Sequence, residues 1–199
     1  MFKKCDNKDM NRGRPKQFDE QQALEAAMQV FWEKGCEATS CEDLLQAMEI
    51  NAGSMYATFG DKQTLYERAF SHYCSRASEQ FLEKLNGPGT PLENIRSFVQ
   101  RLSDIDQKGC MIANTLIEFG HEKSGVGKHA RRVVGQVRKA LEEKLAAAQA
   151  AGELAPGTCP SSLAAFIVNT MQGLSVSIRS GAGRDTIRDV VSTALRLLN

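Results

Sequence analysis

The sequence predicts an all-α protein of about nine helices, and its composition and patterning support this fold class. Proline occurs only five times in 199 residues, and hydrophobic residues make up 42% of the chain. Apolar residues recur three and four positions apart, as they do along one side of an α-helix. No window alternates apolar and polar residues for long enough to predict a β-strand. We therefore expect a helical chain that is long enough to bury a hydrophobic core.

The first expected helix begins at Asp19 and ends at Gly35. Asp19 is a suitable N-cap, and Gln22 three residues later completes the pattern of a capping box. The apolar residues that follow at helical spacing are Leu24, Ala27, Met28 and Phe31. This spacing indicates a helix with one side packed on a core. For Trp32 we also expect a packing role.

Two short helices follow, separated by a tight turn. Ser40 can cap the first of them, which ends near Met48. Asn51 can cap the second, which spans about 51–59, and Gly60 can close it. A helix of this length is too short to be stable alone. The layout is typical of a helix-turn-helix unit that reads DNA.

The second short helix has a small, hydroxyl-rich outer side. Met55 and Phe59, four residues apart, can anchor its inner side to a core. The residues expected to point mostly outward are Gly53, Ser54, Tyr56, Ala57 and Thr58. Small residues let a helix lie deep in a major groove, and hydroxyl groups can bond phosphates and base edges. The chemistry of this side therefore suits DNA.

Several separated landmarks occur in register across this region. They are Ala27-x-x-x-Phe31-x-x-x-Gly35, Ala38-Thr39-Ser40, Leu44, Tyr56-x-x-Phe59-x-x-Lys62 and Leu65. With these landmarks, the run 14–70 resembles the N-terminal domain of the TetR/AcrR family of bacterial transcriptional regulators. The resemblance implies that Ser40 starts the positioning helix and that 51–59 is the recognition helix. It also implies that Tyr56 and Lys62 contact backbone phosphates.

Two positions depart from the pattern of that family. Glu49 occupies the turn position where such domains usually carry Gly, so a left-handed backbone there would cost about 1 kcal/mol, unless the turn has another shape. Ala52 lies where close relatives often have a polar or basic side chain. Both departures bear on which base sequence the unit reads. They also motivate an alternative, a helical interaction protein that has lost operator recognition.

The net charge of +1 conceals a segregation along the chain. Residues 1–18 hold six Lys/Arg against two Asp, residues 19–61 one Lys against nine acids, and residues 62–199 eighteen Lys/Arg against thirteen acids. Because the reading unit is acidic, affinity for phosphates must depend on the basic tail, on Lys62, on helix N-termini and on having two copies.

The basic arm expected in that tail is Arg12-Gly-Arg14-Pro-Lys16. Pro15 keeps this segment out of a helix, and a slim extended chain suits a narrow minor groove. A solvated tail without a function is the alternative. The residues expected to bind DNA are Arg12, Arg14, Lys16, Ser40, Asn51, Ala52, Gly53, Ser54, Tyr56, Ala57, Thr58 and Lys62.

The rest of the chain predicts longer helices, at 62–85, 91–107, 110–119, 127–151, 160–180 and 184–198. The helix at 160–180 is apolar on more than one side, so both of its faces must be covered. By resemblance, the last two helices form a dimer interface, a four-helix bundle made by two subunits. The interface residues expected are Phe166, Gly173, Leu174, Ile187, Val190, Val191 and Ala194. Burial within the core of one chain is the alternative.

The middle helices of that family usually enclose a small-molecule pocket whose occupation changes the separation of the two reading units. By resemblance, the candidate effector-binding residues are Cys110, Met111, Asn114, Glu118, Phe119, Phe166, Asn169, Met171 and Gln172. Ordinary packing is the alternative for each. Cys110 starts a helix after Lys108, where exposed amides, the helix dipole and a cation would favour the thiolate. Such a thiol would react with electrophiles or oxidants, unless it is only a small buried apolar group.

No motif in the chain supports catalysis, a metal site or a bound cofactor. The run 124–129 ends like a phosphate-binding loop but has Glu122 in place of the first Gly and His129 in place of Ser/Thr. The cysteines form no C-x-x-C pair, the histidines match no zinc spacing, and no run of about 18 apolar residues occurs.

We therefore expect a bacterial, cytoplasmic DNA-binding regulator that associates with the nucleoid through operator binding. The chain would form a homodimeric repressor that leaves a palindromic operator in double-stranded DNA when a small-molecule effector binds. Its expected domains are a flexible basic arm at 1–15, a helix-turn-helix domain at 16–76, and an effector-binding and dimerisation domain at 77–199.

Overall fold

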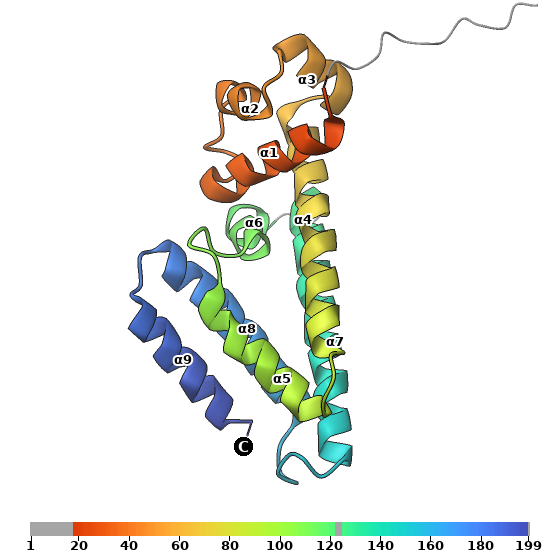
Figure 1. Cartoon of the computed structure of the whole chain (residues 1–199), viewed down its shortest axis with the longest axis vertical. Coiled ribbons are helices and arrows are strands. Elements are labelled where there is room, and N and C mark those ends of the chain that lie inside the picture. Colours follow the sequence, from red (N-terminus) through yellow and green to blue (C-terminus); the bar gives the residue numbers. More distant parts are fainter. Residues whose placement is uncertain (1–17, 122–124, 199) are drawn as a thin grey trace, which may run out of the picture.

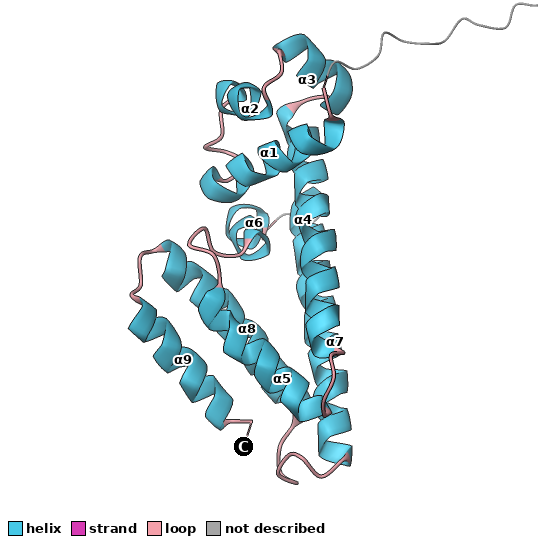
Figure 2. Cartoon of the chain, viewed as in Figure 1, coloured by secondary structure: helices cyan, strands magenta, loops and turns pink. Residues whose placement is uncertain are grey.

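The computed structural model describes residues 18–121 and 125–198. Over these ranges the chain forms nine α-helices and one 3-10 helix, with no β-strand (Figure 2). The prediction of an all-α fold is therefore confirmed. The three N-terminal helices lie at one end of an elongated molecule, and α5, α8 and α9 lie towards the other (Figure 1).

The N-terminal helices are α1 (Glu20–Lys34), α2 (Cys41–Met48) and α3 (Ala52–Phe59). Their N-caps are those that the sequence predicts. Asp19 accepts hydrogen bonds from the amides of Gln21 and Gln22 at 2.8 and 3.0 Å. Ser40 forms a reciprocal capping box with Asp43, with both bonds at 3.0 Å. The Asn51 side chain accepts from the Ser54 amide at 2.8 Å, which satisfies one of the free amides of α3.

The C-terminal part is built on two long helices. Helix α4 (Lys62–Leu85) leads out of the N-terminal bundle and packs against α7 (Gly125–Ala150). The remaining elements are α5 (Pro91–Gln100), η1 (Arg101–Asp104), α6 (Met111–Phe119), α8 (Pro160–Arg179) and α9 (Arg184–Arg196). Helix α6 lies directly below α1, between the N-terminal bundle and the helices α5 and α8 (Figure 1).

Two expected boundaries differ from the observed ones. The helix expected over 91–107 ends at Gln100 and continues only as the 3-10 turn η1, which tightens the helix end and places Leu102 in the core. Helix α7 begins at Gly125, two residues before the expected start. The α-helical ends elsewhere agree within two residues, which is the usual scatter at a frayed helix end.

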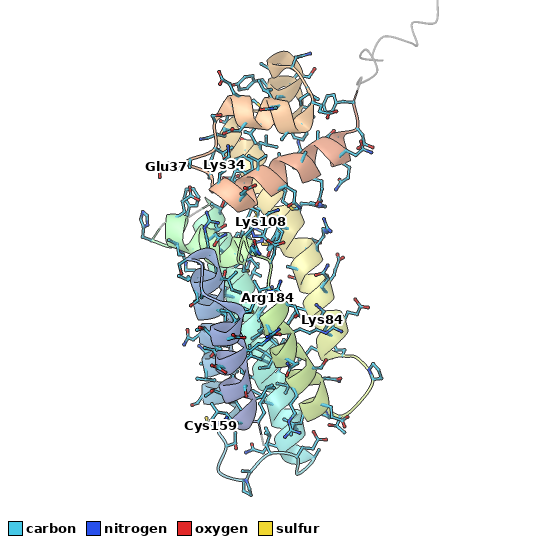
Figure 3. The ribbon with its side chains drawn as sticks, turned by 60° about the vertical axis from the view of Figure 1, so that its left-hand side comes forward. Lys34, Glu37, Lys84, Lys108, Cys159 and Arg184 are labelled. Atoms are coloured by element: carbon cyan, nitrogen blue, oxygen red, sulfur yellow. The ribbon has the colours of Figure 1, made fainter. Side chains whose placement is uncertain are left out.

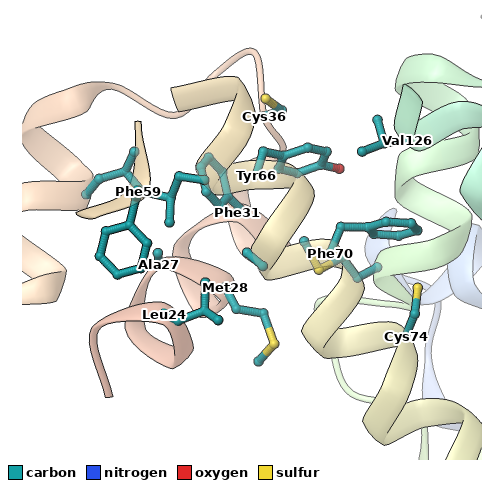
Figure 4. Packing of buried hydrophobic residues seen from close by; sticks show 14 of the residues in the cluster. Leu24, Ala27, Met28, Phe31, Cys36, Phe59, Tyr66, Phe70, Cys74 and Val126 are labelled. Carbon is teal, nitrogen blue, oxygen red and sulfur yellow. The ribbon is translucent and has the colours of Figure 1, made fainter. Parts of the chain in front are cut away.

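The buried side chains form two cores that meet along α7, where Val134 packs against both. The first surrounds Phe31, Tyr66 and Phe70 in the N-terminal bundle (Figure 4). It also includes apolar residues of α6 and α7, among them Met111 and Val126. The second core joins α5, α7, α8 and α9. A boundary at 76/77 falls inside the continuous helix α4, so the division into domains remains a proposal.

The turn between α2 and α3 contains a left-handed residue that is not glycine. Glu49 has φ 54° and ψ 35°, and among the described residues it is the only non-glycine with a positive φ. Its amide and that of Ile50 donate to Gln46 and Leu45 carbonyls, each at 3.4 Å, which closes the end of α2. The turn is thus left-handed at this position, although Glu occupies it and Gly would adopt this conformation most easily.

Replacing Glu49 by Gly should therefore stabilise the protein. Relief of the left-handed strain, less the entropy that Gly adds to the unfolded chain, should raise the free energy of unfolding by about 0.5–1 kcal/mol. For a chain of this size that corresponds to a rise of roughly 1–4 °C in Tm, measurable by differential scanning calorimetry.

Two matched variants separate strain from charge. Glu49→Gln keeps the strain and should leave the Tm unchanged. Gln46→Gly places Gly in the right-handed helix α2 and should lower the Tm. An equal rise in Tm for Glu49→Gln would show that charge, and not backbone strain, is the cause.

Candidate nucleic-acid interface and its coupling to a cavity

The side of α3 that faces away from the protein is small and accessible. Met55 and Phe59 are fully buried in the first core, which fixes the orientation of the helix. The expected contact residues Ala52, Gly53, Tyr56 and Ala57 are exposed, and Ser54 and Thr58 are half-buried. Figure 1 shows α3 at the extremity of the molecule, where a DNA groove could reach it.

Tyr56 is the largest exposed side chain on this face, with 52% of its surface accessible. Its phenol lies 3.7 Å from the thiol of Cys41 at the start of α2. This hydrogen bond raises the pKa of Tyr56 above its ordinary value. The phenol therefore keeps its proton at neutral pH and can donate a hydrogen bond to a phosphate oxygen.

Two expected contact residues, Ser40 and Asn51, serve as N-caps of α2 and α3. Their side-chain oxygens already accept hydrogen bonds from amides of these helices. DNA would therefore meet mainly the amide-rich start of each helix, which is a favourable position for an anion. Arg12, Arg14 and Lys16 lie outside the described residues.

Lys62 has internal partners that the resemblance did not anticipate. Its ammonium group donates to the carbonyl oxygens of Cys36 and Thr39, each at 3.0 Å, and to that of Glu37 at 3.5 Å. An ammonium group has three donors, and here all three meet the turn between α1 and α2. The expected phosphate contact stays a prediction: to make it, Lys62 would have to give up or share one of these bonds.

A cavity of about 310 Å³ lies between α4, η1, α6, α7 and α8. This volume is at the lower end of the range for small-molecule sites. Its wall is mostly aromatic and aliphatic, and its principal side chains are Trp32, Tyr73, Phe81, Phe98, Cys110 and Met171. Trp32 belongs to α1, so the N-terminal bundle itself forms part of the wall.

The structure brings only some of the expected effector-binding residues to this cavity. Cys110 and Met171 line it, and with Gln172 they also line a small adjoining pocket. Met111 is buried in the first core, and the Phe119 ring packs against Tyr66 at 5.6 Å. The residues Phe166 and Asn169 are exposed on α8, and Asn114 donates to the Lys108 carbonyl at 3.1 Å.

Sequence reasoning missed the aromatic part of the cavity wall. Tyr73, Ala77 and Phe81 follow one side of α4 at four-residue spacing, which reads as an ordinary buried face. Phe98 has the same ambiguity on α5. The repeated aromatic side chains were the available signal, but periodicity does not distinguish a packed face from a face that borders a cavity.

Cys110 directly precedes α6 and forms part of the cavity wall. Its thiol accepts a hydrogen bond from the Tyr73 phenol at 3.8 Å, and its amide donates to Ser175 at 2.6 Å. The cation expected to act on this thiol is engaged elsewhere. The Lys108 ammonium lies 5.1 Å from the centre of the Trp32 ring and donates to Gln29 at 2.8 Å, so it faces α1 (Figure 3).

Three groups tie the end of α1 and the following turn to the C-terminal part. The Glu118 carboxylate accepts from the amides of Cys36 and Glu37 at 3.1 and 2.6 Å. The Trp32 indole donates to the Gly109 carbonyl at 3.0 Å. Arg179 donates to the Trp32 carbonyl at 3.1 Å. Glu118 is thus a contact to the reading unit and does not line the cavity.

The expected dimer residues divide into two groups. Leu174, Ile187, Val191 and Ala194 are buried within one chain, which is the alternative that the sequence left open for them. Phe166, Gly173 and Val190 are exposed on α8 and α9, together with Val176.

Helix α8 is long and apolar enough to cross a membrane when only its length and composition are considered, and 33% of that stretch is buried in the chain. A single helix of this kind is weak evidence for a membrane span, because a core helix can have the same length and composition.

These features define a helix-turn-helix DNA-binding transcriptional regulator with an attached helical domain. Two family models match the chain: that of the tetR family of bacterial regulatory proteins over residues 23–69, and that of the tetracyclin repressor-like C-terminal domain over residues 91–195. The chain belongs to the TetR family.

Similar proteins align with nearly the whole chain. The repressor ComR of Escherichia coli is 29% identical over 94% of this chain and 92% of its own length. The regulator YezE of Bacillus subtilis is 32% identical over 94% of this chain and all of its own length. A cysteine variant of the TetR family regulator CifR, solved with a 26-bp double-strand operator, superposes with a TM-score of 0.80 at 29% identity, over 92% of this chain and 98% of CifR.

The internal partners of Lys62 predict a stabilising role for this residue. Lys62→Met keeps the apolar stem but leaves the carbonyls of Cys36 and Thr39 without their charged donor. Because hydrogen bonds to charged groups contribute about 1.5–3 kcal/mol, the free energy of unfolding should fall by about 2 kcal/mol in urea denaturation.

Lys34→Met is the matched control, since the more exposed Lys34 pairs only with the half-buried carboxylate of Asp43, at 2.6 Å, among the contacts described. It should reduce stability less than Lys62→Met, because exposed pairs contribute little. Equal effects of the two substitutions would contradict the structural role assigned to Lys62.

Proposed function

We propose that this protein is a homodimeric repressor that binds a palindromic operator through α3 and is released when a small molecule occupies the cavity. The observation that carries the proposal is the exposed, small and hydroxyl-bearing face of a capped recognition helix in a TetR-family chain. A cytoplasmic location is part of the proposal, since the operator is chromosomal DNA.

The small size of α3 implies that a second copy of the protein takes part in binding. Helix α3 has only eight residues, so one copy can contact few base pairs. Two copies related by a twofold axis would read two half-sites in successive major grooves. The exposed apolar residues Phe166, Val176 and Val190 on α8 and α9 provide a face for that pairing, and Gly173 permits close approach because a Cβ there would contact nothing within the chain.

Release by an effector is supported by the position of the cavity. Trp32 and Gly109 line it, and the hydrogen bond between them links α1 to the segment before α6. A molecule that fits better when this contact is rearranged would shift the protein away from the DNA-binding geometry. Operator affinity would then fall by the ratio of its affinities for the two states.

The proposed effector is an electrophile or an oxidant. The thiol of Cys110 lines the cavity beside the Tyr73 phenol, so a modified sulfur would occupy space next to Gly109 and Trp32. With an α,β-unsaturated aldehyde, the sulfur bonds to the β carbon and the C=C π bond breaks. The α carbon takes up a proton in place of the one that the thiol loses. The aldehyde is the co-reactant that this step requires.

The competing interpretation is a helical interaction protein that has lost operator recognition. Its motives are Glu49, Ala52 and the acidic charge of residues 19–61. The two interpretations differ in whether the protein binds a DNA sequence saturably. They can therefore be separated without knowledge of the effector.

The DNA-binding proposal predicts sequence preference with a strong salt dependence. Genomic fragments bound by the protein are selected, and the affinity for the best fragment is followed by gel shift between low and physiological salt. The logarithm of the affinity should fall linearly with the logarithm of salt. Tyr56→Phe should weaken all sequences several-fold alike, whereas Ser54→Ala or Thr58→Val should change the preferred bases.

Saturable binding to the selected fragment, and none to a fragment of the same composition with its sequence scrambled, supports the regulator. If no fragment binds saturably even at low salt, the proposal fails and the interaction-protein alternative is favoured.

The effector proposal predicts that Cys110→Ser binds the operator like the unsubstituted protein but is not released by hydrogen peroxide or acrolein. Operator release is measured by fluorescence anisotropy of labelled DNA. Trp32, the single Trp of the chain, lines the same cavity, so its emission should change on modification only when Cys110 is present.

Cys159→Ser is the control, because Cys159 is exposed and lies at the end of the molecule opposite α3 (Figure 3). Hydrogen bonds from Ser162 lower its pKa, so Cys159 should react readily without affecting the operator. Full release of the Cys110→Ser variant by both reagents would remove Cys110 from the mechanism.

A further inference from the structure

We propose that Arg68 is the residue that positions the recognition helix for DNA, by holding the C-terminal end of α3 against the start of α1. The inference rests on the proposed role of α3. Arg68 is not among the residues expected to contact DNA. In this proposal it contributes to sequence recognition by positioning α3, without contacting DNA itself.

The Arg68 guanidinium group joins three elements of the N-terminal bundle. From the second turn of α4 it donates through Nη1 to the Thr58 carbonyl at 3.0 Å and through Nη2 to the Glu20 carboxylate at 2.5 Å. Its central carbon lies 4.8 Å from the centre of the Phe59 ring. A planar group with donors in a fixed fork can make these three contacts together, and a lysine cannot.

Helix α3 depends on such a contact at its C-terminal end. The last carbonyls of a helix have no partner within it, and in eight residues they are a large share of all its carbonyls. The Gly60 amide satisfies Tyr56 at 3.1 Å, and Arg68 satisfies Thr58. A cation at this end also complements the helix dipole. Without Arg68, the apolar anchors Met55 and Phe59 would remain, but the last turn would be free to fray.

The contact with Glu20 sets where α3 ends relative to α1. Glu20 is the first residue of α1 and lies two positions after Phe18, whose ring is 6.4 Å from that of Phe59. The expected DNA contacts Tyr56 and Ala57 lie directly before Thr58. Since hydrogen bonds weaken steeply with distance and angle, a small tilt of this turn would remove base contacts while leaving the charge of the surface unchanged.

Two other roles for Arg68 make different predictions. As a direct phosphate contact, it would act through its charge alone and would affect every DNA sequence. As a residue that only stabilises the fold, it would lower the Tm without affecting the affinity of the folded protein. Its position between the Glu20 carboxylate and the Thr58 carbonyl favours positioning over phosphate binding.

The test compares Arg68→Gln and Arg68→Lys with the matched control Arg76→Gln. Arg76 lies two turns further along α4 and pairs with Glu25 of α1 at 2.7 Å, without reaching α3 among the contacts described. Affinities for the selected operator and for unrelated DNA of equal length are measured by fluorescence anisotropy across a salt series, below the Tm of each variant.

We expect Arg68→Gln to lower operator affinity at least ten-fold, to lower the affinity for unrelated DNA far less, through the loss of one charge, and to leave the salt slope of unrelated DNA unchanged. Arg68→Lys should not restore the operator affinity, and Arg76→Gln should behave like the unsubstituted protein. A parallel loss for both DNAs with a salt slope smaller by about 1 would identify a phosphate contact and overturn the proposal. Full activity of Arg68→Lys, or an unchanged operator affinity of Arg68→Gln, would overturn it as well.

Glu20→Gln provides a milder variant in case Arg68→Gln does not fold. Removing an acid should raise the affinity for DNA in general, so a fall in the ratio of operator to unrelated binding can only come from geometry. A raised or unchanged ratio would contradict positioning through Glu20 and Arg68. If the unsubstituted protein shows no preferred sequence, the proposed function fails and this inference fails with it.

Discussion

The recognition helix cannot hold its own shape, and the rest of the N-terminal bundle is arranged around this constraint. Eight residues are too few for a stable helix in water, so neighbouring elements must fix both ends and the inner side of α3. Asn51 caps the first end, Met55 and Phe59 anchor the inner side, and Arg68 holds the last turn. The outer side is thereby left free of structural tasks and can carry small residues suited to a groove.

The junction between the two parts of the chain consists largely of contacts to backbone groups. Glu118 binds two consecutive amides, Lys62 binds carbonyls of the same turn, and Arg179 binds a carbonyl at the end of α1. Backbone groups cannot rearrange as side chains do, so these contacts fix the turn before α2 rigidly. Trp32 lies at the end of α1 and also lines the cavity, so the cavity directly borders the helix that these contacts hold.

Local signals were enough to predict the helices, whereas the tasks of several side chains depend on distant partners. The caps Asp19, Ser40 and Asn51 act within three residues, so the sequence identifies them directly. Lys62 bonds carbonyls more than twenty positions away, and the cavity wall gathers residues from six α-helices and the 3-10 turn η1, which no spacing shows. On α8 and α9, periodicity identifies the apolar residues but does not show which of them are buried within the chain. Leu174 and Val191 are buried in this way.

The acidic charge of residues 19–61 makes geometry decisive for DNA binding. In most DNA-binding proteins a basic surface supplies a sequence-independent background of affinity. Here nine acids oppose one lysine in the reading unit, so that background must be weak around α3. Specific contacts then supply a larger share of the total, and each hydrogen bond that misaligns is felt more. A change of 1.4 kcal/mol already alters affinity ten-fold, so a slight displacement of α3 would suffice for release. A weakly attractive reader is therefore well suited to a regulator that must leave its site.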